Sequence, residues 1–493
     1  MSHRISPRSN ALYKLRSPLI VVSATLFLAG CAQLPELGTT PQPKQQDAFQ
    51  STSSLSAPTA QWPAEEWWMA YGDPQLNALI AEALAESPDL AVAAARLQRA
   101  DAVVQLAGAA SKPQVSANAS VTADKLSYNY LTPREATPSG MNDYGRATVN
   151  MQWDLDFWGK NRAALTVATS DVEASQAELA QARLWLAAGV ASNYAELSRL
   201  YANRETAVRA VEIRQTTARL FAQRFDNGLE TRGGLRNADA RRAVAEGELL
   251  ALDEQIGLQR NRLAVLLGAG PDRGLAIEAP KLRLTRAFGL PSELSANLLG
   301  RRPEVVAARW RAEAQARRID QKKAEFYPNI NLSALVGVQS LGLDLLARSG
   351  SSIASIGPAI SLPIFSAGRL QGQLRAEHAG YAEAVAQYNA TVARALQDVA
   401  NNAVSQKALG ERLGKAQEAV DAATEAHRVV GHRYEGGLAT YLEVLTAEDS
   451  LLGALSAQTN LRAASLTLDI DLQRVLGGGY QSSAANALAS AKP

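Results

Sequence analysis

The chain contains an internal repeat, and this duplication constrains its fold more than any other feature. A helical stretch opening with Ser87-Pro88 stops at Pro113, and one opening with Arg302-Pro303 stops at Pro328, so the two proline intervals are equal. Further matches lie 209 residues apart: Trp158-Gly159-Lys160 with Ala367-Gly368-Arg369, Arg224 to Leu229 with Arg433 to Leu438, and Val265 to Gly268 with Arg474 to Gly477. A period of this kind indicates repeated supersecondary units. The two halves are therefore expected to share one architecture.

Each half contains two segments in which apolar and polar residues alternate. They run over residues 115–123 and 147–157 in the first half, and over 330–338 and 356–364 in the second, where Pro358 interrupts the pattern. Such alternation over about ten residues suits a tilted strand with lipid on one side and water on the other, although a half-buried hairpin of a soluble protein has the same pattern. Trp153, Phe157 and Trp158 near one strand end fit an interfacial aromatic girdle and favour the membrane. The loops 129–143 and 342–352 are expected to face outside the cell.

The remaining sequence predicts helices. Residues from Gly159 to about Phe225 carry no proline, and a seven-residue apolar step runs through Leu165, Val172, Leu179 and Leu186. At 1.5 Å per residue this helix is about 100 Å long, and residues 369–434 repeat it. Shorter helices are expected over residues 88–112, 235–267, 303–326 and 442–476. A coiled-coil bundle of purely structural purpose would look alike, and the strands argue against it.

The N-terminus has the pattern of a secreted lipoprotein. Four basic residues and no acidic ones precede an apolar run that ends in Leu28-Ala29-Gly30-Cys31. The run has about a dozen residues, whereas a membrane span needs about 20. The motif resembles a bacterial lipobox, which implies that Cys31 becomes the lipidated first residue of the mature protein. Ala32 follows it, and this favours the outer membrane.

Composition excludes several functions. Removal of residues 1–30 leaves 46 basic and 48 acidic residues, a balance that argues against a nucleic-acid binder. Cys31 is the one cysteine, so its lipidation leaves no thiol for disulfides or metal sites. His427 and His432 are five apart, off the i, i+4 spacing of two ligands on one helical face. No phosphate loop, metal cluster or nucleophile indicates an enzyme, and the covalent lipid is the only cofactor expected.

Together, the lipobox, the duplicated halves, the strand pairs and the Gly-x-x-Thr turns resemble TolC-type outer-membrane efflux channels. The similarity is to their lipidated branch, with OprM-like and NodT-like proteins, and it covers residues 67–478. Within it, Trp67-Trp68 and Tyr71-Gly72-Asp73-Pro74-Gln75-Leu76 resemble the start of the mature domain. The resemblance implies an α+β, mostly α membrane protein: a homotrimer whose twelve strands, four per copy, form an outer-membrane β-barrel that continues into a periplasmic α-helical barrel.

The need for several copies also follows from the strands alone. Open sheet edges are not tolerated in hydrocarbon, and closed membrane barrels begin at about eight strands. Four strands per chain therefore require oligomerisation if they insert. Two, three or four copies satisfy this condition, and the resemblance selects three.

These features divide the chain into six segments. Residues 1–30 are the signal peptide, 31–70 the lipid-anchored segment, 71–270 the first efflux repeat, 271–294 an equatorial linker and 295–478 the second repeat. Gly477-Gly478-Gly479 follows a helix end, so residues 479–493 are expected to form a flexible tail.

The two helical turns are the candidate functional site. Gly228 and Gly437 follow helix ends, where a left-handed residue caps the carbonyls, and Thr231 and Thr440 start the next helices. Taken alone, these residues indicate an ordinary turn that ends one helix and begins the next. The resemblance implies that these tips contact a periplasmic adaptor protein and that the second repeat's inner helix constricts the pore.

The same resemblance assigns a periplasmic gate to the start of that inner helix. The family often has Tyr-Leu-x-x-Leu-Asp-Ala there, whereas this chain has Tyr441-Leu442-Glu443-Val444-Leu445-Thr446-Ala447. Thr446 thus replaces the usual carboxylate, and Glu443 and Asp449 are candidates for a negative ring one turn away, unless they form a solvated helix face. Arg232 is the candidate cation that faces them and holds neighbouring turns together.

The sequence therefore predicts the outer-membrane channel of a tripartite efflux system. It would passively conduct drugs or other small toxic compounds from an inner-membrane pump and an adaptor to the exterior of a Gram-negative cell. The alternative is a lipid-anchored periplasmic adaptor. An adaptor should carry lipoyl-like and β-barrel modules in place of two matched hairpins.

Overall fold

A computed structural model describes residues 34–50, 53–129, 132–284, 287–292 and 294–482. The signal peptide and Cys31 lie outside the described residues. The chain forms two compact units. The strand unit comprises residues up to Gln42, Arg99–Glu173 and Trp310–Ala386, and the helical unit comprises Pro43–Gln98, Ala174–Arg309 and the chain from Gln387 onward.

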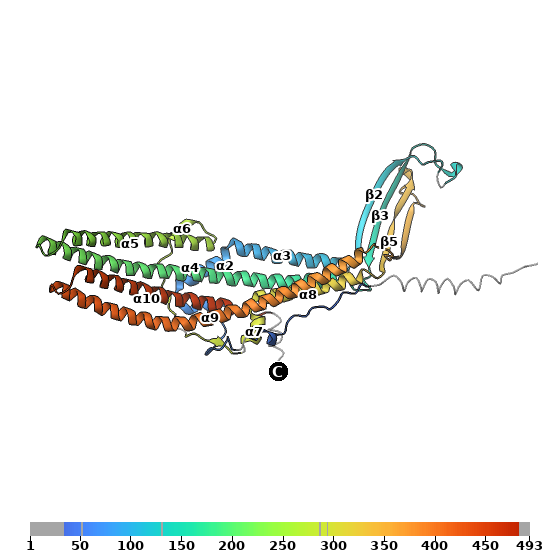
Figure 1. The fold of residues 1–493 in the computed structure, drawn as a ribbon. Coiled ribbons are helices and arrows are strands. Elements are labelled where there is room, and N and C mark those ends of the chain that lie inside the picture. Colours follow the sequence, from blue (N-terminus) through green and yellow to red (C-terminus); the bar gives the residue numbers. More distant parts are fainter. Residues whose placement is uncertain (1–33, 51–52, 130–131, 285–286, 293, 483–493) are drawn as a thin grey trace, which may run out of the picture. The chain divides into compact units, whose positions relative to one another are not determined.

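The strand unit contains a four-stranded antiparallel sheet in the order β2-β3-β5-β6 (Figure 1). The bounds are β2 Gln114–Asp124, β3 Asn142–Asp154, β5 Asn329–Leu341 and β6 Ser352–Ser361. Each repeat contributes one hairpin, and the pairing of β3 with β5 joins the two repeats into one sheet. All four predicted strands are confirmed, and β2 and β6 form the two edges of the sheet.

Two strand ends differ from the prediction. β3 ends at Asp154, so Leu155 and Phe157 lie beyond it, because Asp156 has a left-handed backbone (φ 45°) and caps the next helix. Its carboxylate accepts hydrogen bonds from the backbone N–H of Asn161 and Arg162, both at 2.9 Å. β6 ends before Ile364 and contains Pro358. A proline is tolerated there because β6 is an edge strand.

The long helices have equal lengths in the two repeats. In the first, α3 (Pro88–Ala109), α4 (Lys160–Asp226) and α5 (Arg232–Leu266) have 22, 67 and 35 residues. In the second, α8 (Pro303–Ala324), α9 (Arg369–Glu435) and α10 (Tyr441–Val475) have the same three lengths. The duplication predicted from the sequence is thus confirmed. Among the described residues, no helix has the length and apolar character needed to cross a membrane.

Within the helical unit, four helices lie side by side in the order α5, α4, α10, α9 (Figure 1). Polar contacts join each neighbouring pair. The Gln259 side chain of α5 donates to the Asn193 carbonyl of α4 at 2.9 Å, and Arg199 of α4 donates to Asn460 of α10 at 3.1 Å. Asn402 of α9 donates to the Leu468 carbonyl of α10 at 2.9 Å.

Short elements cross these helices and tie them together. The 3-10 helix η2 (Trp67–Tyr71) and helix α2 (Pro74–Glu86) pack into an apolar core with Tyr194 and Leu263. Asp73 caps α2 and also accepts hydrogen bonds from the Tyr194 hydroxyl (2.9 Å) and the Lys281 N–H (2.7 Å). The segment predicted to start the mature domain is therefore buried and connects helix α4 to the linker between the repeats.

The residues between the two repeats are also structured. They contain α6 (Pro271–Leu275), β4 (Leu290–Pro291) and α7 (Leu294–Arg301). β4 pairs in parallel with β1 (Thr59–Ala60), so the chain ahead of the first repeat is tied to the linker between the repeats. The 3-10 helix η1 (Gln46–Phe49) precedes β1.

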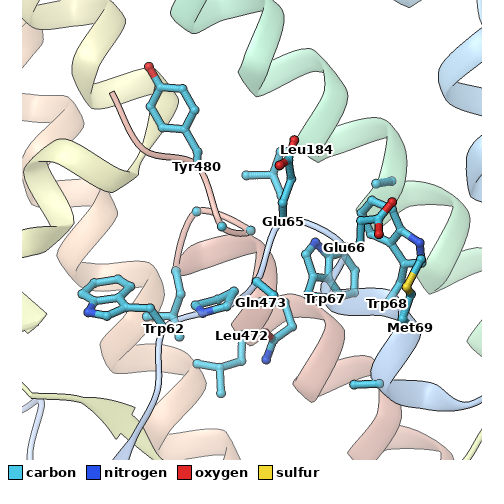
Figure 2. A pocket seen from close by; sticks show the side chains of 18 of the residues that line it. Trp62, Glu65, Glu66, Trp67, Trp68, Met69, Leu184, Leu472, Gln473 and Tyr480 are labelled. Atoms are coloured by element: carbon cyan, nitrogen blue, oxygen red, sulfur yellow. The ribbon is translucent and has the colours of Figure 1, made fainter. Parts of the chain in front are cut away.

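The glycines after α10 do not start a free tail. A Cβ on Gly477 would lie 2.0 Å from the Arg301 carbonyl oxygen, and one on Gly479 would lie 2.5 Å from the Ala64 backbone. Glycine is therefore required by close backbone packing and not by flexibility. Figure 2 shows the cavity of about 1340 Å³ beside these residues, with Trp67, Gln473 and Tyr480 in its wall. Residues 483–493 of the predicted tail lie outside the described residues.

Candidate functional site

The turns between the long helices have the caps that the sequence predicts. Gly228 (φ 72°) and Gly437 (φ 74°) are left-handed, a conformation that glycine adopts without strain. Their N–H groups donate to the carbonyls of Phe225 (2.9 Å) and Tyr434 (3.0 Å). The N–H groups of the next residues, Leu229 and Leu438, donate to carbonyls one residue further back in each helix. These bonds satisfy carbonyls that a helix end leaves free.

The following helices begin with threonine caps, as expected. The Thr231 hydroxyl accepts from the Gly234 N–H at 3.0 Å, and the Thr440 hydroxyl accepts from the Glu443 N–H at 3.4 Å. The Glu443 carboxylate in turn accepts from the Thr440 N–H at 2.8 Å, which completes a capping box. Glu443 therefore holds the turn in shape.

An aromatic cluster joins the two turns. The ring of Phe221 lies 5.4 Å from that of Tyr434 and 6.1 Å from that of Tyr441. The Tyr434 hydroxyl donates to Glu230 at 2.7 Å, and the Arg224 guanidinium lies 4.5 Å from the Tyr434 ring centre. Burial, together with this carboxylate, raises the pKa of Tyr434 above its usual range. The first-repeat turn is thus fastened to the second-repeat helix end.

A charged network lies about two to four turns of helix away and links three helices. Arg214 of α4 donates to Glu448 of α10 at 2.9 Å and also to Asp449, and Arg241 of α5 donates to Asp449 at 2.6 Å. The Thr217 hydroxyl donates to the second Glu448 oxygen at 3.2 Å. Glu448 is 0% exposed. This network fixes the inner helix α10 against both helices of the first repeat.

The two carboxylates of the network differ in their electrostatics. Burial raises the pKa of Glu448 above its ordinary value, and Arg214 opposes this only in part. Burial also acts to raise the pKa of Asp449, but its hydrogen bonds to Arg241 and Arg214 outweigh that effect and lower it. Asp449 is therefore held as an anion between two cations.

The predicted gate residues have separate roles in the structure. Asp449 is in the network, Glu443 is in the capping box, and Tyr441 is in the aromatic cluster. The Thr446 hydroxyl donates to the Leu442 carbonyl of its own helix at 2.7 Å, and the Leu442 side chain is exposed. Arg232 is exposed, and within the described chain it contacts neither Glu443 nor Asp449. The cations that hold Asp449 are Arg214 and Arg241.

The sequence reasoning missed Arg214, Arg241 and Glu448. Comparison of the repeats carries a signal for the two arginines, whereas Glu448 corresponds to another acidic residue, Asp239, and has none. At the equivalent positions, 209 residues away, Arg214 corresponds to Ala423, Arg241 to Ser450 and Asp449 to Ala240. Where a charged residue of one repeat is replaced by a small residue at the equivalent position of the other, the two repeats have different partners at that position.

The sheet has one apolar and one polar face. Residues that stand opposite each other share a face, so the register puts Ala117, Val149 and Val336 on one side, with Asn118, Thr148 and Gly337 on the other. Val115, Val121, Val149, Val336, Ile356 and Ile360 are all exposed on the apolar side. Exposed valine and isoleucine along a whole sheet face match the lipid-facing surface of a membrane strand.

A sheet of this kind, with free edges and joined to two helical hairpins, defines the class of outer-membrane channel proteins. The outer membrane efflux protein family model matches residues 79–269 and 294–478, and the chain belongs to that family. It is an outer-membrane efflux channel. The predicted periplasmic adaptor alternative is thereby excluded.

Relatives and solved structures agree with this assignment. The chain is 38% identical to the fusaric acid resistance protein FusA of Burkholderia cepacia over 73% of this chain and 69% of that protein. It is 29% identical to the multidrug resistance outer membrane protein MdtP of Escherichia coli K12 over 94% and 96%. The crystal structure of the outer membrane protein VceC of Vibrio cholerae matches with 47% identity and a TM-score of 0.82, over 85% of this chain and all of that one.

The family also defines the kind of assembly. Its channels are trimers that work with adaptor proteins and inner-membrane pumps. The predicted mostly helical, trimeric channel fold is confirmed at this level.

Proposed function

We propose that three copies of this chain form a passive conduit through which an inner-membrane pump, joined by a periplasmic adaptor, exports small toxic compounds. The observation that carries the proposal is the sheet with one apolar and one polar face and two free edges. Three such sheets joined edge to edge leave no open edge in hydrocarbon. The names of FusA and MdtP point to fusaric acid and drugs as the class of cargo.

The proposal includes no catalysis and no cofactor apart from a covalent lipid on Cys31. Transport energy comes from the pump, and the polar sheet faces line a water-filled path. The exposed Leu229, Leu438 and Leu442 at the two turns supply an apolar surface for the adaptor, beside the caps at Gly228, Thr231, Gly437 and Thr440.

The gate of this conduit is the network around Asp449. Arg241 and Asp449 are partly exposed, with side chains 31% and 50% accessible, so their ion pair is weak, about 0.2–1 kcal/mol. Three symmetric copies triple that bias, which is enough to favour a closed tip and small enough for an adaptor to overcome. In the isolated trimer the tip is therefore closed.

Export is tested by deleting the gene and measuring growth with fusaric acid and a panel of drugs. The deletion should sensitise cells, and the plasmid-borne chain should restore growth. The purified trimer should form low-conductance channels in planar bilayers. Two outcomes would refute the proposal. One is that cells remain fully sensitive to these compounds although the channel is assembled, and the other is that deletion leaves resistance unchanged in a strain without other efflux channels.

A further inference from the structure

A single cation lies inside the described four-stranded sheet, away from the strand ends. The charged residues of these strands are one arginine, Arg146 of β3, and three aspartates, each within two residues of a strand end. The aspartates are Asp124, Asp143 and Asp154. At the equivalent position of the second repeat, 209 residues later, β6 has the neutral Ser355. The cation is thus specific to the first repeat.

The strand register places Arg146 on the polar face of the sheet. Arg146 stands opposite Ser120 of β2 and Gln339 of β5. Side chains alternate along a strand, so Arg146 lies on the side opposite to Val149. An arginine on the lipid-facing side of a membrane strand is strongly destabilising, whereas water in the lumen solvates it. Arg146 is therefore a cation of the lumen wall.

Within the described chain, no acid neutralises Arg146. The two residues opposite it are neutral, and no described residue forms an ion pair with its guanidinium. The aspartates on its own face, Asp124 and Asp154, lie four and eight residues along the sheet, which is about 14 and 27 Å. Both distances exceed the Debye length of about 8 Å at physiological salt. The positive field of Arg146 therefore acts on solutes that pass along the wall.

An apolar surface adjoins this cation on the same face. Tyr144 is two residues from Arg146 on β3, about 7 Å along the strand, and stands directly opposite Leu341 of β5. Leu341 is 45% exposed, and Tyr144 is partly exposed. A guanidinium pairs well with a carboxylate, and an aromatic ring beside an aliphatic side chain packs against another apolar ring. The three side chains thus match a molecule that has both groups.

We propose that Arg146, Tyr144 and Leu341 form a binding site on the channel wall for organic anions that carry an apolar ring. The carboxylate pairs with Arg146, and the ring packs on Tyr144 and Leu341. Rings of charged side chains set the ion preference of other pores by the same electrostatics. The site rests on the proposed function and adds a cargo preference to it, because anions are attracted to this wall and cations are repelled.

The charge preference is tested with a thiol directly opposite Arg146. Ser120→Cys is placed in the full-length trimer in outer-membrane vesicles, and the unsubstituted chain reports the background from Cys31, the one native cysteine. The measured quantity is the ratio of the modification rates by sulfonatoethyl and trimethylammonioethyl methanethiosulfonate. Adding Arg146→Gln should lower this ratio about threefold at about 0.15 M salt, for charges about 6 Å apart. Effects of Arg146 on the thiol itself cancel in the ratio.

Matched variants separate the site from general charge effects. Arg348→Gln removes an exposed arginine of the neighbouring loop and should leave the Ser120→Cys ratio unchanged. Arg146→Lys keeps the charge and should preserve the ratio. Ser116→Cys, four residues away on the same face, should respond little to Arg146→Gln. An unchanged ratio in Arg146→Gln, or failure of both reagents to modify Ser120→Cys, overturns the site.

The ligand class is tested by protection of the same thiol. The probes are para-butylbenzoate and its neutral counterpart para-butylbenzamide, and the thiol reagent is the uncharged methyl methanethiosulfonate. Millimolar benzoate should slow modification of Ser120→Cys severalfold, whereas the amide should not, and Arg146→Gln should abolish the protection. Absence of protection, or equal protection by the two compounds, overturns the assignment to organic anions.

These labelling readouts need no export, so the two proposals can fail separately. If the wild-type chain shows the charge preference and the protection but exports nothing, the proposed function is refuted and the site stands. If the chain exports drugs and shows neither effect, the site alone is refuted.

Discussion

At the scale of single residues, Arg214 has a different role from Arg241 although both bind Asp449. Arg214 and Glu448 are buried, with side chains 9% and 0% exposed. Removal of one partner from a buried pair leaves an uncompensated charge and costs about 3–5 kcal/mol. The Arg241–Asp449 pair is partly exposed and weaker. The first pair therefore holds the fold, and the second is weak enough to switch.

The first prediction follows from the buried pair. Glu448→Ala should lower the free energy of unfolding, by at most about 3–5 kcal/mol, because Arg214 then keeps only the partly exposed Asp449 as a partner and the Thr217 hydroxyl loses its acceptor. The thermal midpoint of the detergent-solubilised trimer reports this loss. Glu425→Gln, which breaks the exposed pair of Glu425 with Arg428, is the control and should leave the midpoint within experimental error. Equal midpoints for both variants would show that Asp449 alone compensates the Arg214 charge.

A second prediction concerns the Arg241–Asp449 ion pair. Arg241→Ala should raise single-channel conductance in planar bilayers and sensitise cells to large antibiotics such as vancomycin, since Asp449 then loses one of its two cations. Arg232→Ala is the matched control on the same helix, because Arg232 does not contact Asp449 in the described chain. The idea fails if Arg232→Ala opens the channel as much as Arg241→Ala does.

The pH dependence of the same pair gives a third prediction. The folded pKa of Asp449 is lowered, so its ion pairs are intact above the ordinary aspartate pKa. They persist as the pH falls past that value and are lost only at the lower, folded pKa. Acid-induced opening should therefore occur below the ordinary aspartate range in the wild type and at higher pH in Arg241→Ala. The measurement is single-channel conductance while the periplasmic side is acidified. Identical dependence of conductance on pH in the wild type and in Arg241→Ala would contradict the prediction.

At the scale of secondary-structure elements, the caps show how small sequence signals set boundaries. Asp156 ends β3 and starts α4, because its carboxylate serves the first N–H groups of the helix. The equivalent residue of the second repeat, 209 positions later, is Phe365, which is exposed. The same helix start is thus capped in one repeat and left without a carboxylate in the other.

The sheet provides a fourth prediction. Val149→Arg, on the apolar face, should cost about 2–4 kcal/mol if this face meets lipid near mid-membrane, and the trimer yield in outer-membrane fractions should fall. Asn150→Arg, on the opposite face, should instead change conductance and leave the yield unchanged. Leu332→Arg and Asn331→Arg repeat the comparison on β5. A similar loss of trimer yield for substitutions on both faces of the sheet would argue against a lipid-facing apolar side.

At the scale of the whole molecule, the fifth prediction concerns the anchor. Mass spectrometry of the outer-membrane protein should find Cys31 as an acylated first residue. Cys31→Ser should remove the acyl chains and still allow insertion, since one or two chains add little to a spanning sheet. An uncut Met1 or an unmodified Cys31 in the mature protein would refute the lipidation.

Patterns in the sequence were sufficient to predict the duplication, the four strands, the long helices and the caps of both turns. These features depend on local patterns: strict alternation over a strand, proline at helix starts, glycine after helix ends and threonine before them. The resemblance that these patterns carry was also sufficient to place the chain in its family.

Which side chains meet could be seen only in the folded chain. Asp449 was singled out from the sequence, but its partners Arg214 and Arg241 lie more than 200 residues away in sequence, and the chain offers many exposed arginines. The three glycines after α10 look like a flexible tail in sequence, but Gly477 and Gly479 are packed against the Arg301 and Ala64 backbones. Pairwise contacts between distant segments depend on how helices are rotated and stacked, and local periodicity leaves those quantities free.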